Sequence, residues 1–185
     1  MGWKTIYQTL ENRDNADEVE RDGPFLCDRK NAWLGTGYYF WDTFVELAHW
    51  WGRQSYKGNY LVCRTSIEEG ENRIFDLLGN TEHLNEFKAC AHALQQKYGR
   101  PLTVSFVIEY IKRNTSFRFK AIRAYPIGCV KQDESIQSQR MPFLVGHSAY
   151  LDLVPAIQIC VLDKRIIPAG SFKVVYPEKY VEGVV

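Results

Sequence analysis

The sequence predicts a single α+β domain over residues 1–185. Strand-like segments fill both ends of the chain, and two helical segments lie together in the middle. Strands and helices do not alternate regularly, which disfavours a doubly wound parallel sheet and favours a mostly antiparallel or split one. Hydrophobic residues make up 45% and charged residues 24%, a composition typical of a folded domain of ordinary size.

β-Branched and aromatic residues, bounded by glycine, proline and charged turns, predict the strands. In chain order the expected strands are residues 3–9, 38–41, 60–67, 117–125, 156–163 and 171–176, with short extended pieces at 24–27 and 73–78. The charged run 11–23 predicts a surface loop or a short helix. We expect loops at 30–37 and 128–140, and irregular structure at 142–153.

A helical period predicts the three expected helices. The first follows a Thr43–Glu46 capping box, with Asp42 just before it, and ends at Gly52 or Gly58. Its expected inward face consists of Phe44, Leu47, Ala48 and Trp51. Residues 81–98 predict the second helix and residues 101–113 the third, because Gly99 and Pro101 interrupt the pattern between them.

Composition and missing motifs exclude several classes of protein. A net charge of +1 provides no overall basic field for nucleic acid or membranes. The five separated cysteines predict free thiols in a reducing, cytoplasmic compartment, and no apolar run is long enough to span a membrane. The sequence has no phosphate-binding glycine loop, no nucleophile elbow and no histidine pair with metal-ligand spacing, so we expect no metal.

Residues 34–52 combine a glycine turn, an aromatic strand and a helix, and predict the wall of a pocket for a flat heterocycle. Aromatic residues make up 14% of the chain, which suits either a binding cleft or an aromatic core. Strand alternation places Tyr39 and Trp41 on one side and Tyr38 and Phe40 on the other, so we expect at least one pair in the core.

The segment Gly35-Thr36-Gly37-Tyr38-Tyr39-Phe40-Trp41-Asp42, followed by a helix, resembles the nicotinamide-binding segment of the ADP-ribosyltransferase superfamily. The similarity is to the diphtheria-toxin and poly-ADP-ribose-polymerase branch and to small bacterial proteins of that fold. It implies split antiparallel β-sheets and a nicotinamide ring clamped by two aromatics. Tyr39 and Trp50 have the matching spacing of eleven residues, with Gly37 and Tyr38 beside them, and we expect Trp51 in the core.

Two further segments are similar to motifs of this family. Ile6-Tyr7-Gln8-Thr9 stands where the family has a His-Gly-Thr motif, which places Gln8 at the ribose-binding histidine and Thr9 at the glycine. Gln158 stands where the family has the glutamate that holds the nicotinamide ribose and supports the cationic transition state. A neutral amide supplies no negative charge there. The carboxylates considered instead are Glu109, Glu134 and Asp152.

The resemblance implies a toxin-like enzyme that takes NAD as its substrate and passes ADP-ribose to an unknown macromolecule or to water, with Gln158 and Tyr39 as catalytic residues. The alternative is an inactive module of this fold that binds NAD, ADP-ribose or a protein. A third interpretation is an α+β domain without a small-molecule site, in which Tyr39 and Trp50 do not face one cleft. The alternating Arg118, Lys120 and Arg123 predict a solvated face, or a site for a pyrophosphate or an acidic target.

Overall fold

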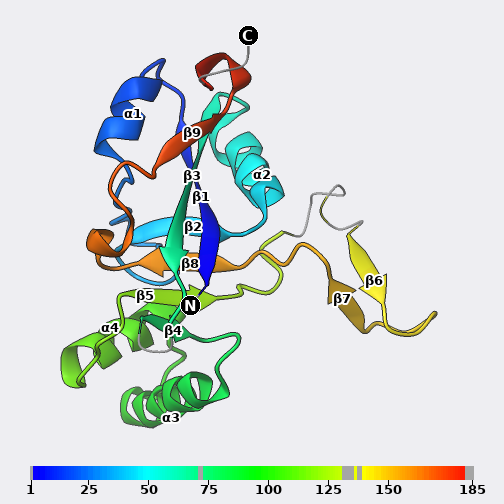
Figure 1. The fold of residues 1–185 in the computed structure, drawn as a ribbon. Helices are drawn as coiled ribbons and strands as arrows, with labels where there is room; N and C mark the ends of the chain where they lie inside the picture. The colour runs from blue at the N-terminus through cyan, green and yellow to red at the C-terminus, as the bar shows by residue number, and fades with distance from the viewer. Residues whose placement is uncertain (1, 71–72, 131–135, 137–138, 182–185) are drawn as a thin grey trace.

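The computed structural model of the protein describes residues 2–70, 73–130, 136 and 139–181. Within these residues the chain forms four α-helices, a mixed seven-stranded sheet and a two-stranded hairpin (Figure 1). The predicted single α+β domain is therefore confirmed. None of the helices in this part of the chain is long and apolar enough to cross a membrane.

The strands are β1 (Trp3–Glu11), β2 (Tyr38–Asp42), β3 (Tyr60–Glu68), β4 (Ile74–Asp76), β5 (Ala121–Ala124), β6 (Arg140–Pro142), β7 (Tyr150–Asp152), β8 (Gln158–Val161) and β9 (Lys173–Tyr176). The α-helices are α1 (Ala16–Asp22), α2 (Val45–Tyr56), α3 (Thr81–Tyr98) and α4 (Val104–Asn114). Two short 3-10 helices follow β8 and β9, namely η1 (Lys164–Ile166) and η2 (Glu178–Tyr180).

The large sheet has the strand order β4-β5-β8-β2-β1-β3-β9. Neighbouring strands are antiparallel except β4 and β5, which are parallel, so the sheet is mixed rather than purely antiparallel. β1 pairs with β3 along its whole length, whereas it pairs with β2 only at Ile6↔Asp42 and Tyr7↔Trp41. This short junction joins the β9-β3-β1 part of the sheet to the β2-β8-β5-β4 part.

The capping-box prediction for α2 is wrong. The helix starts at Val45 after an extended Phe44, and no side chain caps it. Thr43 instead has a left-handed backbone, with φ of 63°, and its hydroxyl donates to Asp42 Oδ1 at 2.7 Å. Gly52 does not end the helix either, because it lies inside α2 against the ring of Tyr60, where a Cβ would come within 2.4 Å of that ring.

The expected irregular stretch 142–153 is also corrected by the structure. Its two ends form the β6–β7 hairpin, which projects away from the rest of the fold (Figure 1). The strand expected over 117–125 is limited to β5, and part of the expected 128–140 loop lies outside the described residues. The charged run 11–23 contains the short helix α1, one of the two alternatives that the sequence allowed.

Candidate functional site: an aromatic cavity at the sheet junction

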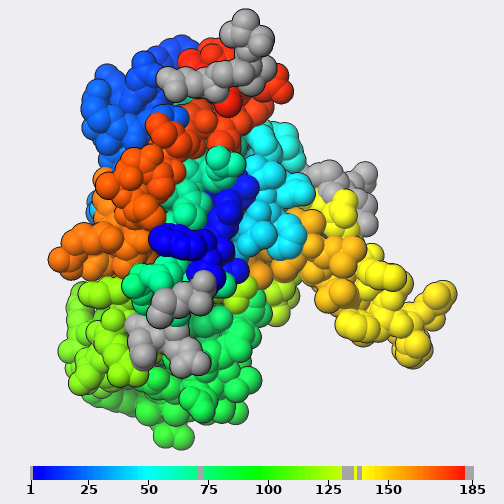
Figure 2. Space-filling view, viewed as in Figure 1, coloured from blue at the N-terminus to red at the C-terminus, as the bar shows by residue number. Residues whose placement is uncertain are grey.

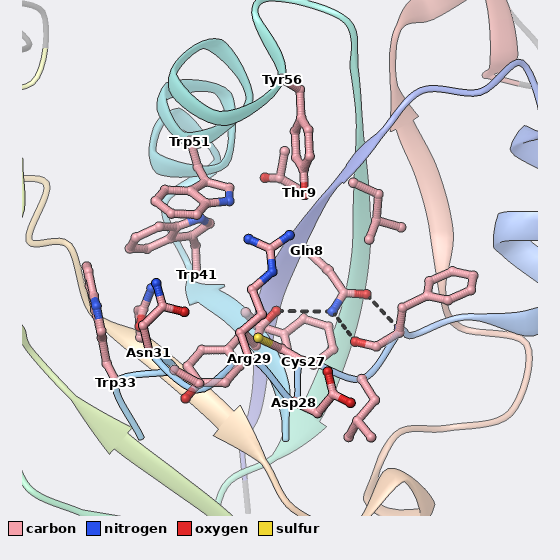
Figure 3. A pocket seen from close by; sticks show the side chains of 17 residues that line it. Gln8, Thr9, Cys27, Asp28, Arg29, Asn31, Trp33, Trp41, Trp51 and Tyr56 are labelled. Atoms are coloured by element: carbon pink, nitrogen blue, oxygen red, sulfur yellow. Dashed lines mark hydrogen bonds between the residues drawn. The ribbon is translucent and has the colours of Figure 1, made fainter. Parts of the chain in front are cut away.

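A cavity of about 310 Å³ lies where β1 and β2 separate. Backbone pairing between the two strands ends at Tyr7 and Trp41, and the side chain of Gln8 fills the next position. Its amide nitrogen donates to the carbonyl oxygens of Tyr39 at 3.3 Å and Phe25 at 3.0 Å, and its amide oxygen accepts from the Phe25 N–H at 2.9 Å (Figure 3). Gln8 therefore fixes the width of the gap in which the cavity opens.

The walls of the cavity are largely aromatic. Seven aromatic residues line it: Phe25, Trp33, Tyr39, Phe40, Trp41, Trp51 and Tyr56. The polar residues of the lining are Gln8, Thr9, Asp28, Arg29, Asn31 and Gln158. Figure 3 shows the Arg29 side chain pointing into the cavity, toward the side where Trp51 and Tyr56 lie. The lining thus offers several ring faces, three amides, one carboxylate and one guanidinium among the described residues.

The glycine loop before β2 brings Tyr39 to this cavity. Gly35 has a φ of 85°, a conformation that other residues rarely adopt. Gly37 lies against β8, where a Cβ would come within 2.4 Å of Cys160 Sγ. The resulting turn lets the Tyr39 hydroxyl donate to the Gly35 carbonyl oxygen and accept from the Leu34 N–H, both at 2.7 Å. The Tyr39 hydroxyl is therefore held by two backbone groups of the glycine loop.

Four of the residues expected at a site line one cavity: Gln8, Thr9, Tyr39 and Gln158. The sequence did not fix this juxtaposition, because the four come from β1, β2 and β8. Thr9 donates to the Ala48 carbonyl oxygen at 2.8 Å, which ties β1 to α2. Gly37 and Tyr38 do not line the cavity; Gly37 shapes the loop, and Tyr38 packs against the hydrophobic core.

The two neighbouring tryptophans of α2 are placed in the reverse of the expected arrangement. Trp50 is 7% exposed and packs edge-on against Trp41, with ring centroids 5.8 Å apart, whereas Trp51 lines the cavity. Trp50 follows Leu47 by three residues and so continues the buried face of the helix. Tyr39 and Trp50 therefore do not share a cleft, which is what the interpretation without a small-molecule site requires. Tyr39 and Trp51, however, line the same cavity.

Gln158 carries a buried acceptor with no partner. It begins β8 and lies between Trp41 of β2 and Ala124 of β5 in the sheet. Its side-chain oxygen is buried and has no hydrogen-bond donor among the described residues. Buried polar atoms in folded proteins are nearly always paired, so this oxygen is an unusual feature of a residue that also lines the cavity.

Asp28 and Arg29 are functional candidates that sequence reasoning missed. Among the described residues that line the cavity, Asp28 is the one acidic residue and Arg29 the one basic residue. No motif or periodicity distinguishes them, since they lie in a loop that reaches the cavity only after Cys27 bridges to Gly37. Their position therefore depends on tertiary structure.

The alternative carboxylates lie elsewhere. Glu109 on α4 binds Lys112 at 2.7 Å, and Asp152 on β7 accepts from the Tyr125 hydroxyl at 2.5 Å; neither lines the cavity. Glu134 lies outside the described residues. Among the described carboxylates, Asp28 lines the cavity and is therefore the candidate to supply the negative charge that the neutral Gln158 lacks.

Two ionisable groups beside the cavity are held neutral. Burial raises the pKa of the Tyr39 hydroxyl and raises that of the Cys160 thiol to about 12, so both keep their protons near pH 7. The described residues contain no group of three or more histidine, cysteine or acidic side chains that could hold a metal ion. Stacking and hydrogen bonding are therefore the interactions that this lining provides most directly.

Comparisons with known proteins leave the family open. No protein-family model matches the sequence, and no solved structure matches it. The chain is similar to the uncharacterized protein MJ0359 of Methanocaldococcus jannaschii, with 24% identity over 181 residues that cover 88% of this chain and 84% of the relative. The name of that protein carries no activity, so the function has to be argued from the cavity itself.

Proposed function

We propose that the protein binds NAD in the aromatic cavity and is an ADP-ribosyltransferase-like enzyme that passes ADP-ribose to a macromolecule or to water. The observation that carries the proposal is the convergence of Gln8, Tyr39 and Gln158 on one cavity at the junction of β1 and β2. Three separate segments of the sequence, each similar to a motif of one family, predict these residues. Their meeting in one place supports a common ligand.

The chemistry of the lining suits the nicotinamide ring of oxidised NAD. That ring is flat, electron-poor and positively charged, and electron-rich indole and phenol faces attract such a cation. Trp51 and Tyr39 offer those faces, and the amide of Gln158, which lines the same cavity, offers hydrogen-bonding groups for a ribose hydroxyl or the carboxamide. The volume of about 310 Å³ suits a ring and part of its substituent, with the remainder of the dinucleotide at the rim.

In the proposed reaction, the bond between the nicotinamide nitrogen and the ribose carbon breaks, and its electron pair leaves with nicotinamide. A hydroxyl oxygen of water or of the acceptor then bonds to the cationic ribose carbon and loses its proton. Asp28 is the one carboxylate among the described residues of the lining, so it is the candidate to stabilise the developing cation and to accept that proton. Gln158 would position the ribose without supplying charge.

A second candidate is a module of the same fold that binds NAD or ADP-ribose without cleaving it. The specific observation in its favour is the neutral side chain at Gln158, the position at which the family resemblance implies a glutamate. Asp28 is exposed in a loop, so the described part of the lining contains no buried carboxylate. Both candidates require NAD binding, and they differ only in the release of nicotinamide.

The test measures NAD binding by calorimetry and nicotinamide release by chromatography on the same protein samples. For the enzyme, we expect binding and release by the wild type, and loss of both in Tyr39→Ala. For the module, we expect binding without release. Thermal unfolding of each variant establishes that it is folded. An absence of both binding and release in the folded wild type would refute the two candidates together.

The variant Gln158→Glu separates position from charge. If Gln158 faces the ribose, the new carboxylate raises nicotinamide release, and Asp28→Asn lowers it. Gln96→Glu is the matched control, because it adds the same charge to an exposed position on α3. An equal rise in Gln158→Glu and Gln96→Glu would show that the effect does not arise in the cavity.

A further inference from the structure

A second hollow, of about 570 Å³, is lined by cationic side chains and one indole. Its lining consists of Trp3, Arg73, Arg118, Lys120, Arg165, Ile166 and Pro168, and it shares no residue with the aromatic cavity. The residues come from the start of β1, the segments that lead into β4 and β5, and η1 with the residues after it. Figure 2 shows the start of β1 in blue beside the orange segment that contains η1 on one face of the molecule.

The positive charge of this hollow is only partly neutralised. Arg73 contacts Glu68 at 2.7 Å, while Lys120 and Arg165 share Asp163 at 3.3 and 2.8 Å. Arg118 is exposed and has no carboxylate partner among the described residues. Among the described residues, these four cations thus pair with two carboxylates, an excess of two positive charges.

Only part of the basic alternation reaches the hollow. β5 begins at Ala121, so Arg118 and Lys120 lie in the segment that leads into the strand, whereas Arg123 lies within it. Arg123 binds the buried Asp42 at 2.7 Å and Asp76 at 3.1 Å. The predicted solvated face is therefore wrong for Arg123, and the cations at 118 and 120 are joined by Arg73 and Arg165.

Trp3 distinguishes this hollow from a simple anion site. Its side chain is 62% exposed, although a large indole usually loses solvent contact in a folded protein. An exposed aromatic face next to several cations is the combination with which proteins bind single-stranded nucleic acid, because the base stacks and its phosphates meet the charges. A phosphopeptide or a lipid headgroup would use the cations but would leave the indole without a partner.

We propose that this hollow binds single-stranded nucleic acid, with a base stacked on Trp3 and backbone phosphates bound by Arg118 and the neighbouring cations. The proposal does not depend on NAD binding, since the two sites share no residue. The exposed indole and the uncompensated charge together favour this class of ligand.

The test is fluorescence anisotropy with labelled single-stranded DNA and RNA of about twelve nucleotides, titrated with the full chain at about 50 to 200 mM salt. Arg118→Glu should weaken binding about tenfold and reduce the slope of log affinity against log salt by about 0.7, the value for one lost phosphate contact. Lys88→Glu is the matched control, because it makes the same charge change at an exposed site on α3 and should change the affinity less than about twofold.

Trp3→Ala should weaken binding about tenfold without changing the salt slope, because it removes stacking and no charge. Trp3→Phe should keep part of that affinity, and thermal unfolding shows that each variant is folded. The proposal is overturned if the wild type does not bind either oligonucleotide, or if Lys88→Glu weakens binding as much as Arg118→Glu. It is also overturned if a phosphoserine peptide competes as well as the oligonucleotide and Trp3→Ala has no effect.

Discussion

Asp42 is the residue whose loss should most disturb the junction that opens the aromatic cavity. Its side chain is 2% exposed at the end of β2, and one carboxylate oxygen accepts from Arg123 Nε at 2.7 Å. The other oxygen lies 3.3 Å from Lys4 Nζ and accepts from the Thr43 hydroxyl at 2.7 Å. These contacts connect β1, β2 and β5 across the place where β1 and β2 share only two residue pairs.

The expected effect of Asp42→Asn depends on the carboxylates that remain beside Arg123 and Lys4 after the substitution. Removing one member of a buried ion pair typically costs about 3 to 5 kcal/mol, because a buried charge is left uncompensated. Here Arg123 retains Asp76 at 3.1 Å and Lys4 retains Glu69 at 3.0 Å. We therefore expect a loss of about 2 to 3 kcal/mol in the free energy of unfolding, below the full range.

Urea unfolding followed by circular dichroism measures this loss. With a slope of about 2 kcal/mol per molar urea, the midpoint should fall by about 1 to 1.5 M. Asp14→Asn, at an exposed carboxylate paired with Lys179, should leave the midpoint unchanged. A midpoint for Asp42→Asn equal to that of the wild type would refute the reasoning. So would strict additivity with Arg123→Gln, because residues in one ion-pair network are expected to be coupled.

Three further predictions concern the site and its support. Gly37→Ala should lower stability by about 2 kcal/mol in urea unfolding, because its Cβ would meet Cys160 Sγ at 2.4 Å. Trp51→Ala should weaken NAD binding by about fivefold to tenfold in calorimetry, whereas Trp50→Ala should chiefly lower stability, by about 3 kcal/mol or more. Asp76→Asn should flatten the fall in stability below about pH 4, measured by urea unfolding at several pH values.

The sign of the Asp76 prediction follows from its surroundings. Burial alone raises the pKa of this carboxyl, but the N–H groups of Gly79 and Leu78 and the Arg123 guanidinium together outweigh burial and lower the pKa. A carboxyl with a lowered folded-state pKa stabilises the fold above its unfolded pKa of about 3.9, and that contribution is lost as the pH falls through the folded-state pKa. A steeper acid loss in Asp76→Asn than in the wild type would contradict this assignment.

Most of the fold was predictable because its elements depend on local pattern. The long strand at 60–67 and the helix at 81–98 have the composition and periodicity of their observed elements β3 and α3. The errors lie where tertiary contacts override local signals. Thr43 fits a helix cap by sequence, but the left-handed turn that joins β2 to α2 directs its hydroxyl to Asp42. The sequence of the β6–β7 hairpin has no alternation of apolar and polar residues that would distinguish it from a loop.

The candidate site was predictable in its residue types but only partly in its members. Gln8, Tyr39 and Gln158 were recognised through motif resemblance, and the structure brings them to one cavity. The choice between Trp50 and Trp51 failed because adjacent helical residues differ by about 100° in direction, and the burial of one depends on how α2 rotates against β1. Asp28 and Arg29 had no sequence signal, since a loop has no periodicity to relate them to a sheet.

The sequence by itself determined an α+β domain, its principal strands and helices, and an aromatic segment preceded by glycines that suits a flat ligand. Only the tertiary structure decided that β1 and β2 separate after two residue pairs, that Trp51 rather than Trp50 lines the opening, and that a loop delivers a carboxylate there. The physical reason is that secondary structure follows from contacts between near neighbours in the chain. A cavity arises instead where distant segments fail to meet, and that depends on the packing of the whole domain.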